Sequence, residues 1–247
     1  MGAPEAILLA LAAFGGGALN AVAGGGSFLT FPALIFTGVA PIEANATSAV
    51  ALWPGTLASI LAYRRELLAE RAEARGLALL SLVGGTLGAL LLVNTPPAVF
   101  MEIVPFLLLA ATLLFAFGDR LHSLQGRRGH HRPAFGLLAQ LGIAVYGGYF
   151  GGGIGIMMLA AFALTGMTDI HRMNALKVLL TLAINGVAVV TFAVTGVVEW
   201  LPAALMIAGA VLGGYGGAAL ALRLDPRWVR RFVIALGAAM SAWFFIR

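Results

Sequence analysis

Long apolar segments follow one another through most of the chain, with only short polar connections between them. A helix needs about 20 apolar residues to cross the hydrocarbon core of a bilayer. Segments of suitable length are expected at approximately 4–23, 41–63, 76–94, 98–118, 133–149, 169–195, 201–222 and 228–246. This succession predicts an all-α fold, a polytopic helical bundle integral to a membrane.

The composition agrees with a membrane bundle and excludes several other classes. Hydrophobic residues make up 61% of the 247 residues and charged residues only 10%, whereas a soluble domain is about 45–50% apolar and about 25% charged. The net charge of +5 comes from arginines in short connections, so we expect no nucleic-acid binding. The chain has no cysteine, which excludes disulfides and thiolate metal sites.

Two further apolar segments, 27–39 and 154–167, are too short to span a bilayer comfortably and suit a half-helix or a re-entrant segment. Each of them directly follows three consecutive glycines. These triplets are Gly24, Gly25 and Gly26 in the first case, and Gly151, Gly152 and Gly153 in the second.

The paired triplets belong to a longer internal repeat with an offset of 127 to 129 residues. Matches include Thr37 and Gly38 with Thr165 and Gly166, Asn45 with Asn174, and Gly84 and Gly88 with Gly213 and Gly217. We therefore expect a first transmembrane repeat over residues 1–125, a linker to about 132, and a second repeat over 133–247.

The positions of the arginines predict how the two repeats are oriented. Apart from Arg247, the arginines occur in four regions, residues 63–76, 118–133, 171–173 and 222–231. Short loops rich in Lys and Arg stay in the cytoplasm. All four regions lie on one side only if each glycine-linked unit returns to the side from which it entered. The repeats are then inverted, and both termini lie on the non-cytoplasmic side.

A break in a membrane helix exposes backbone N–H and C=O groups, and each costs several kcal/mol if protein, water or a ligand does not satisfy it. If Ser27 and Ile154 begin short helices, their amides and the positive dipole ends form a cradle for an anion. The alternative is that the glycines only allow close helix packing. Packing is the role that we expect for Gly84, Gly88, Gly213 and Gly217.

A polar cluster follows each short segment. Asn45, Thr47 and Ser48 belong to the first, and Asn174 and Lys177 to the second. The spacing of three residues places Asn45 with Ser48, and Asn174 with Lys177, on one helix face.

Lys177 is the single lysine of the chain. It stands roughly 12 Å into its predicted helix at 1.5 Å per residue. A charge at such depth needs a partner or a function. We expect Lys177 to attract an anionic substrate, and the alternatives are snorkelling to the interface or a structural ion pair.

The predicted substrate site therefore consists of both glycine triplets and the two polar clusters. Its residues are Gly24, Gly25, Gly26, Ser27, Asn45, Thr47, Ser48, Gly151, Gly152, Gly153, Asn174 and Lys177. Further polar residues that could line it are Asn20, Tyr149, His171 and Arg172. Catalytic signatures and paired intramembrane carboxylates are missing, so neither an enzyme nor a cofactor or metal site is expected.

The stretches AGGGSFLTFPALIFTGVAPIEANATS and FGGGIGIMMLAAFALTGMTDIHRMNALK, with YRR at the end of the following helix, resemble the sulfite exporter TauE/SafE family of bacterial membrane permeases. The second stretch departs from the family pattern at Leu176 and Lys177. The resemblance implies a multi-pass protein of the bacterial inner membrane. It also implies export or import of a small sulfur-containing or organic anion, such as sulfite, thiosulfate or sulfoacetate.

With this resemblance, the sequence favours a secondary transporter that works by alternating access. An anion channel lined by the same residues is the alternative, and a non-transporting assembly or sensor protein is a third class. The expected partners are a small anionic solute and the lipid bilayer. The sequence leaves open whether the chain acts alone or as a homo-oligomer.

Overall fold

The computed structural model describes residues 1–23, 25–62, 71–123, 133–167, 169–221 and 226–246. Within these residues the regular structure is entirely helical, which confirms the all-α class. The helices are α1 (Ala3–Ala23), α2 (Ser27–Phe36), α3 (Pro41–Ala62), α5 (Arg71–Asn94), α6 (Pro97–Ser123), α7 (Pro133–Tyr149), α8 (Ile154–Leu164), α9 (Ile170–Thr195), α10 (Trp200–Ala221) and α11 (Pro226–Ile246).

Helix positions agree closely with the apolar segments, but α5 and α6 are longer than expected at the ends near 71 and 123. The apolar pattern marks only the part of a helix that suits hydrocarbon. Backbone hydrogen bonding continues into the polar interface until a cap ends it. The linker at 124–132 lies outside the described residues.

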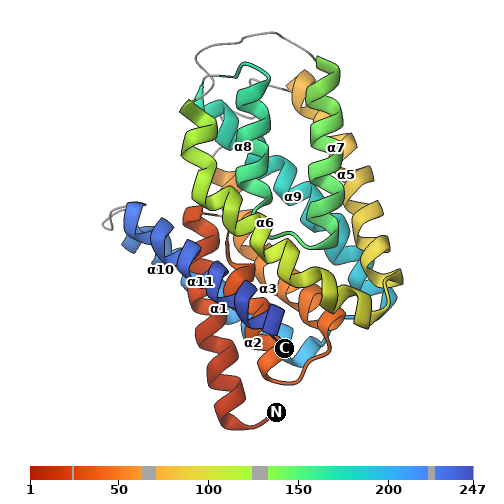
Figure 1. Cartoon of the computed structure of the whole chain (residues 1–247), viewed down its shortest axis with the longest axis vertical. Helices are drawn as coiled ribbons and strands as arrows, with labels where there is room; N and C mark the ends of the chain where they lie inside the picture. The colour runs from red at the N-terminus through yellow and green to blue at the C-terminus, as the bar shows by residue number, and fades with distance from the viewer. Residues whose placement is uncertain (24, 63–70, 124–132, 168, 222–225, 247) are drawn as a thin grey trace.

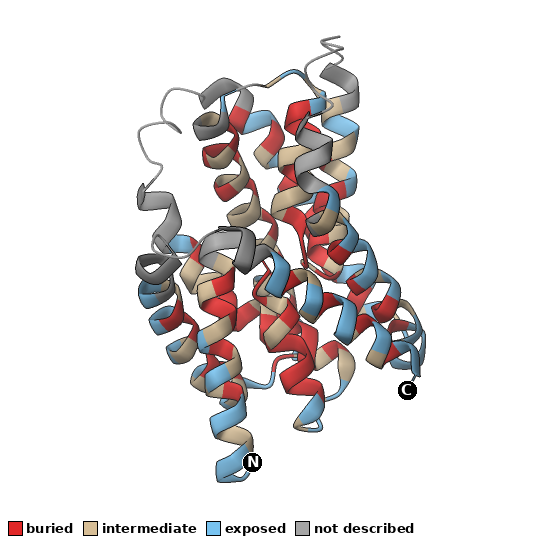
Figure 2. Cartoon of the chain, turned by 60° about the vertical axis from the view of Figure 1, so that its left-hand side comes forward, coloured by how far each residue is buried: buried red, intermediate tan, exposed pale blue. Residues whose placement is uncertain are grey.

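Several helices meet the requirements for crossing a bilayer. Among the described residues, four helical segments are long and apolar enough: 3–20, 74–94, 97–114 and 172–195. The outer faces of the bundle carry large apolar side chains, including Leu138, Val194 and Leu212, which are 69%, 82% and 66% exposed. Buried residues concentrate along the interior (Figure 2). This distribution suits lipid rather than water around the bundle.

Two helical hairpins enter the bundle from opposite ends (Figure 1). Hairpin 1 consists of α1 and α2, and hairpin 2 consists of α7 and α8. Both chain termini lie toward the end from which α1 starts, which we call the terminus end. The tips of the two hairpins are the glycine-rich segments between their helices.

Glycines hold the hairpins against helices of the other half of the chain. α1 packs against α10, and α5 packs against α7. A β-carbon at Gly213 would overlap the backbone of Phe14, and one at Gly88 would overlap the carbonyl of Val145. The packing role predicted for Gly84, Gly88 and Gly213 is therefore confirmed, while the surroundings of Gly217 lie outside the described part.

The short helices α2 and α8 end in the same way. In α2, Gly38 N–H donates to the carbonyl of Ile35 and Val39 N–H donates to that of Leu34, each at 3.1 Å. In α8, Gly166 and Met167 repeat this pair of bonds at 3.0 Å. These are Schellman caps, and the φ angles of Gly38 and Gly166, +84° and +93°, provide the left-handed residue that such caps use.

Candidate functional site

The two glycine-rich tips differ in backbone conformation. Gly26 precedes α2 with helical angles, φ −57° and ψ −36°. In hairpin 2, Gly151 and Gly153 have left-handed φ angles of +82° and +79°. Gly24 lies outside the described residues, so the predicted triplet of hairpin 1 is seen from Gly25 onward.

Glycine is required at the two tips for different reasons. A β-carbon at Gly26 would lie 2.6 Å from the carbonyl oxygen of Gly16 and 3.0 Å from the Leu52 side chain. At Gly153 the positive φ angle disfavours any residue with a side chain, and a β-carbon would also lie 3.2 Å from Ala111. Glycine is therefore needed at position 26 because neighbouring atoms leave no room for a β-carbon, and at position 153 because of the left-handed backbone angle.

Both short helices begin at these tips. The amides of Leu29 and Thr30 donate to the carbonyl of Gly26 at 3.1 and 3.2 Å, and the amides of Ile156 and Met157 donate to that of Gly153 at the same distances. The amides of Ser27 and Ile154 precede these bonds. They therefore belong to the first turn, whose donors lack intrahelical acceptors.

A buried group of polar side chains lies beside hairpin 1. The hydroxyl oxygens of Thr30 and Ser48 are 2.6 Å apart, and the Thr30 hydroxyl donates to the carbonyl of Gly26 at 3.2 Å. Neither side chain is more than 1% exposed. Sequence reasoning identified Ser48 but missed Thr30. Thr30 could have been noticed as the one hydroxyl residue after Ser27 in the apolar segment of α2.

Asn45 connects α3 to hairpin 2. Its side-chain amide donates to the carbonyl of Tyr149 at 3.1 Å, at the end of α7. The Thr47 hydroxyl points elsewhere, because it accepts the amide hydrogen of Glu199 at 3.0 Å. The structure thus separates Thr47 from Asn45 and Ser48, with which it was grouped from the sequence.

A second polar group lies beside hairpin 2. The Lys177 ammonium donates to the Asn174 side-chain oxygen at 2.8 Å. The stem of Lys177 runs against α8, since a β-carbon at Gly155 would lie 3.3 Å from its Cδ. The Tyr146 hydroxyl donates to the carbonyl of Gly152 at 2.9 Å. Lys177 is therefore positioned next to the first turn of α8. Its partner Asn174 is neutral, so this hydrogen bond does not neutralise the positive charge of the ammonium.

The other predicted residues lie around these groups. Asn20 is half-buried near the end of α1. The Tyr149 hydroxyl donates to that of Thr95 at 3.4 Å. The backbone amide of Arg172 donates to the Asp169 carboxylate at 3.3 Å, at the start of α9. The side chain of His171 lies outside the described part.

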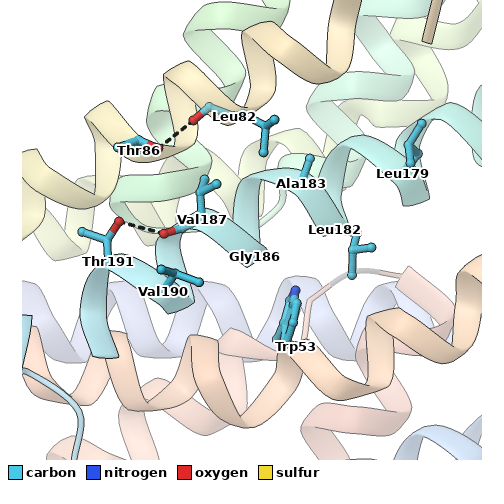
Figure 3. Close-up of a pocket in the computed structure, with 10 residues that line it drawn as sticks. All are labelled: Trp53, Leu82, Thr86, Leu179, Leu182, Ala183, Gly186, Val187, Val190 and Thr191. Atoms are coloured by element: carbon cyan, nitrogen blue, oxygen red, sulfur yellow. Dashed lines mark hydrogen bonds between the residues drawn. The ribbon is translucent and has the colours of Figure 1, made fainter. Parts of the chain in front are cut away.

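A cavity of about 470 Å³ lies between α3, α5 and α9 (Figure 3). Its walls are mostly apolar, and the hydroxyls of Thr86 and Thr191 donate to carbonyls of their own helices at 2.8 and 2.7 Å. None of the predicted site residues lines this cavity. The ten residues that line it are Trp53, Leu82, Thr86, Leu179, Leu182, Ala183, Gly186, Val187, Val190 and Thr191.

The polar groups beside the hairpins can stabilise negative charge. They include first-turn amides and one ammonium, which are donors to an anion. The Thr30 hydroxyl hydrogen is already used at the carbonyl of Gly26, and the Ser48 hydroxyl bonds Thr30. No group of three or more His, Asp or Glu side chains suited to a metal ion is found within the described ranges.

Comparisons with known proteins agree with a membrane transporter. The family model for the sulfite exporter TauE/SafE matches residues 9–244. A probable membrane transporter protein of Haemophilus influenzae is 29% identical over 225 residues, covering 91% of this chain and 88% of the relative. The probable membrane transporter protein YfcA of Escherichia coli K12 is 27% identical, covering 92% and 84%.

A third relative, the probable membrane transporter protein ORF9 of a Sinorhizobium species, is 28% identical, covering 94% of this chain and 89% of the relative. No solved structure matches significantly. Because the family model covers nearly the whole chain, this protein belongs to the sulfite exporter TauE/SafE family of multi-pass membrane transporters.

Proposed function

We propose that the protein is a secondary transporter that carries a small anion across the bacterial inner membrane by alternating access. The observation that carries the choice of an anion is the position of Lys177, beside the first turn of α8 and bonded to Asn174 at 2.8 Å. An ammonium and a helix N-terminus together favour a negative ligand.

The proposed substrates are sulfur-containing or organic anions such as sulfite, thiosulfate or sulfoacetate. The family description names sulfite export, which supports this class. Their oxygens are acceptors, and they match the amide and ammonium donors beside the hairpins. In this proposal the solute contacts Gly25, Gly26, Ser27 and Ser48 from hairpin 1 and α3, together with Gly151, Gly152, Gly153, Asn174 and Lys177. Asn45 contributes its second amide hydrogen, and Thr47 supports α10.

We further propose that the two halves, 1–125 and 133–247, are inverted repeats. If the described helices of the first half correspond in order to those of the second, α1 matches α7 and α5 matches α10. The contact between α1 and α10 then corresponds to the contact between α5 and α7. In the same way, the contact of α5 with α9 corresponds to that of α10 with α3, and the contact of α2 with α11 corresponds to that of α8 with α6. The shared Schellman caps also support the repeat.

Inverted repeats suggest a mechanism. Transporters built this way bind solute near the bilayer midplane, where discontinuous helices meet, and expose the site alternately to each side by rocking of the repeats. Hairpins 1 and 2 provide the discontinuous helices, and each packs against α10 or α5 of the opposite half. The arginine pattern favours both termini on the non-cytoplasmic side.

A thermal-shift screen of the detergent-purified protein tests the substrate class. Sulfite, thiosulfate, sulfate, sulfoacetate and carboxylates are compared, because a bound ligand stabilises the folded form by mass action. We expect one class of anion to stabilise the protein selectively, and we expect Lys177→Met to lose this stabilisation. Arg75→Met, which removes an exposed cation, is the control and should keep it. An equal anion response in Lys177→Met, or no response of the unmodified protein to any of them, refutes the proposed site.

Flux in proteoliposomes then tests the mechanism. A carrier saturates with substrate and shows counterflow of labelled solute against an unlabelled gradient. Unsaturated flux without counterflow contradicts alternating access and assigns the same residues to a channel.

A further inference from the structure

Five aromatic side chains meet next to the tip of hairpin 2. Phe31 is at the centre, with its ring centroid 6.3 Å from Phe100, 5.9 Å from Phe150 and 5.8 Å from Phe244. Phe100 in turn meets Tyr149 at 5.8 Å. We call Phe31, Phe100, Tyr149, Phe150 and Phe244 the aromatic cluster. It joins α2, α6, α11 and the tip of hairpin 2.

The aromatic cluster is tightly buried. Phe31 and Phe100 are 0% exposed, and Phe150 is 4% exposed. Lipid tails are as apolar as these side chains, so burial in a membrane protein reflects specific packing rather than escape from water. These rings fill the interior of the bundle between α2, α6, α11 and the tip of hairpin 2.

The aromatic cluster lies next to the polar groups of the candidate site, on the side of the terminus end. Phe31 follows Thr30 along α2, which runs toward that end (Figure 1). Phe100 lies in the first turn of α6 and Phe244 in the last turn of α11, which are the ends of those helices nearest the terminus end. The aromatic cluster therefore lies between Thr30 and the terminus end.

The opposite side has no equivalent set of rings in the sequence. With the repeat offsets of 127 and 129, Tyr149 and Phe150 correspond to Val22 and Ala23, Phe31 to Met158 and Phe100 to Val229, whereas Phe244 corresponds to Phe115. Four of the five rings therefore have no aromatic counterpart at the equivalent position of the other repeat.

The tip of hairpin 2 combines a few side-chain hydrogen bonds with a glycine-rich backbone. The Tyr146 hydroxyl bonds the carbonyl of Gly152 within it at 2.9 Å. Two side-chain hydrogen bonds fix Tyr149: Asn45 to its carbonyl at 3.1 Å, and its own hydroxyl to Thr95 at 3.4 Å. Beyond it, Gly151 and Gly153 have left-handed backbone angles. Such glycines can absorb the backbone changes of a hinge.

We propose that the aromatic cluster is the gate that closes the solute path at the terminus end, and that the tip of hairpin 2 is its moving part. This inference rests on the proposed transport function. In this structure the gate is closed. Opening withdraws Phe150 from Phe31 and breaks the bond between Asn45 and Tyr149.

A single cysteine at Ser48 reports whether the gate is open, because the chain has no cysteine of its own and Ser48 is 1% exposed. Proteoliposomes are labelled from the terminus end with a membrane-impermeant thiol reagent. We expect slow labelling of Ser48→Cys, and labelling faster by about tenfold or more when Phe150→Ala is added, since the ring contacts that hold the gate are lost.

Phe106→Ala is the matched control. Phe106 also lies in α6 and pairs with a ring, Phe245 at 5.0 Å, but it is 59% exposed on the outer face. It should leave the labelling rate of Ser48→Cys unchanged. Asn45→Ala, which frees the tip without removing a ring, should accelerate labelling from the same side.

Several results would overturn the gate. They are fast labelling of Ser48→Cys with the cluster intact, equal effects of Phe106→Ala and Phe150→Ala, or acceleration only from the opposite side. If Phe150→Ala does not elute as a single species, Phe150→Leu replaces it, and no acceleration in that variant counts against the gate. Labelling requires no substrate, so a failed gate and a failed anion assignment are separate results.

Discussion

The side-chain amide of Asn45 donates a hydrogen bond to the backbone carbonyl of Tyr149 at 3.1 Å, although the residues are 104 positions apart. The carbonyl belongs to the last turn of α7, where carbonyls lack intrahelical donors. α3 of the first half thus satisfies a helix end of the second half. The bond ties the candidate site to the tip of hairpin 2.

Replacing Asn45 by Ala should destabilise the protein modestly. The lost bond between helices is worth about 0.6–1.7 kcal/mol in a membrane protein. Asn94→Ala is the control, because Asn94 is exposed and bonds only to Leu90 of its own helix. Unfolding in detergent should show a lower stability for Asn45→Ala than for Asn94→Ala, and equal stabilities would mean that the bond contributes nothing to the fold.

The positions of the helices could be predicted because bilayer thickness fixes the length of an apolar segment. α7 was predicted at 133–149 and is found as Pro133–Tyr149. The two short apolar segments were predicted at 27–39 and 154–167, and α2 and α8 are found within them. These features depend on residues that are neighbours in the chain.

Contacts between distant segments could not be predicted in the same way. The pair Thr30 and Ser48 and the bond from Glu199 to Thr47 depend on how α2, α3 and α10 pack. Neither has a periodic signal. Thr47 was grouped with Asn45 and Ser48 because it lies in the same polar stretch, but its hydroxyl is used at the start of α10. Phe31 and the three rings that contact it come from four separate segments.

Substitutions at the glycine contact between α5 and α7 should be strongly destabilising. A β-carbon at Gly88 or Gly148 would overlap backbone atoms of the other helix, whereas one at Gly142, also in α7, meets nothing within 4 Å. Overpacking of this kind typically costs about 1–3 kcal/mol. Gly88→Ala and Gly148→Ala should therefore unfold at lower denaturant or temperature, with Gly142→Ala unchanged. Wild-type stability in all three variants would contradict the close approach of the two backbones.

The two Schellman caps predict a different pattern of substitutions. Gly38 and Gly166 have positive φ angles, and a β-carbon at either residue would meet no atom within 4 Å, so conformation alone disfavours a side chain. Ala at either position should cost about 1–2 kcal/mol, and Asn should cost less because it tolerates left-handed angles. Gly216→Ala, in open space on α10, is the control. Thermal unfolding measures the order of stability of these variants. An Asn variant that is less stable than the Ala variant would contradict a conformational cause.

The orientation of the chain in the membrane is predicted from its arginines. Those between α3 and α5 and between α6 and α7 should hold that end in the cytoplasm, leaving the terminus end outside. Gly2→Cys and Gly76→Cys mark the two ends in a cysteine-free chain, and neither new side chain meets a close contact. In spheroplasts, an impermeant thiol reagent should label Gly2→Cys directly and Gly76→Cys only after lysis. The reverse order places both termini in the cytoplasm. It would also transfer the aromatic cluster to the cytoplasmic mouth of the path, because the rings lie at the terminus end in either orientation.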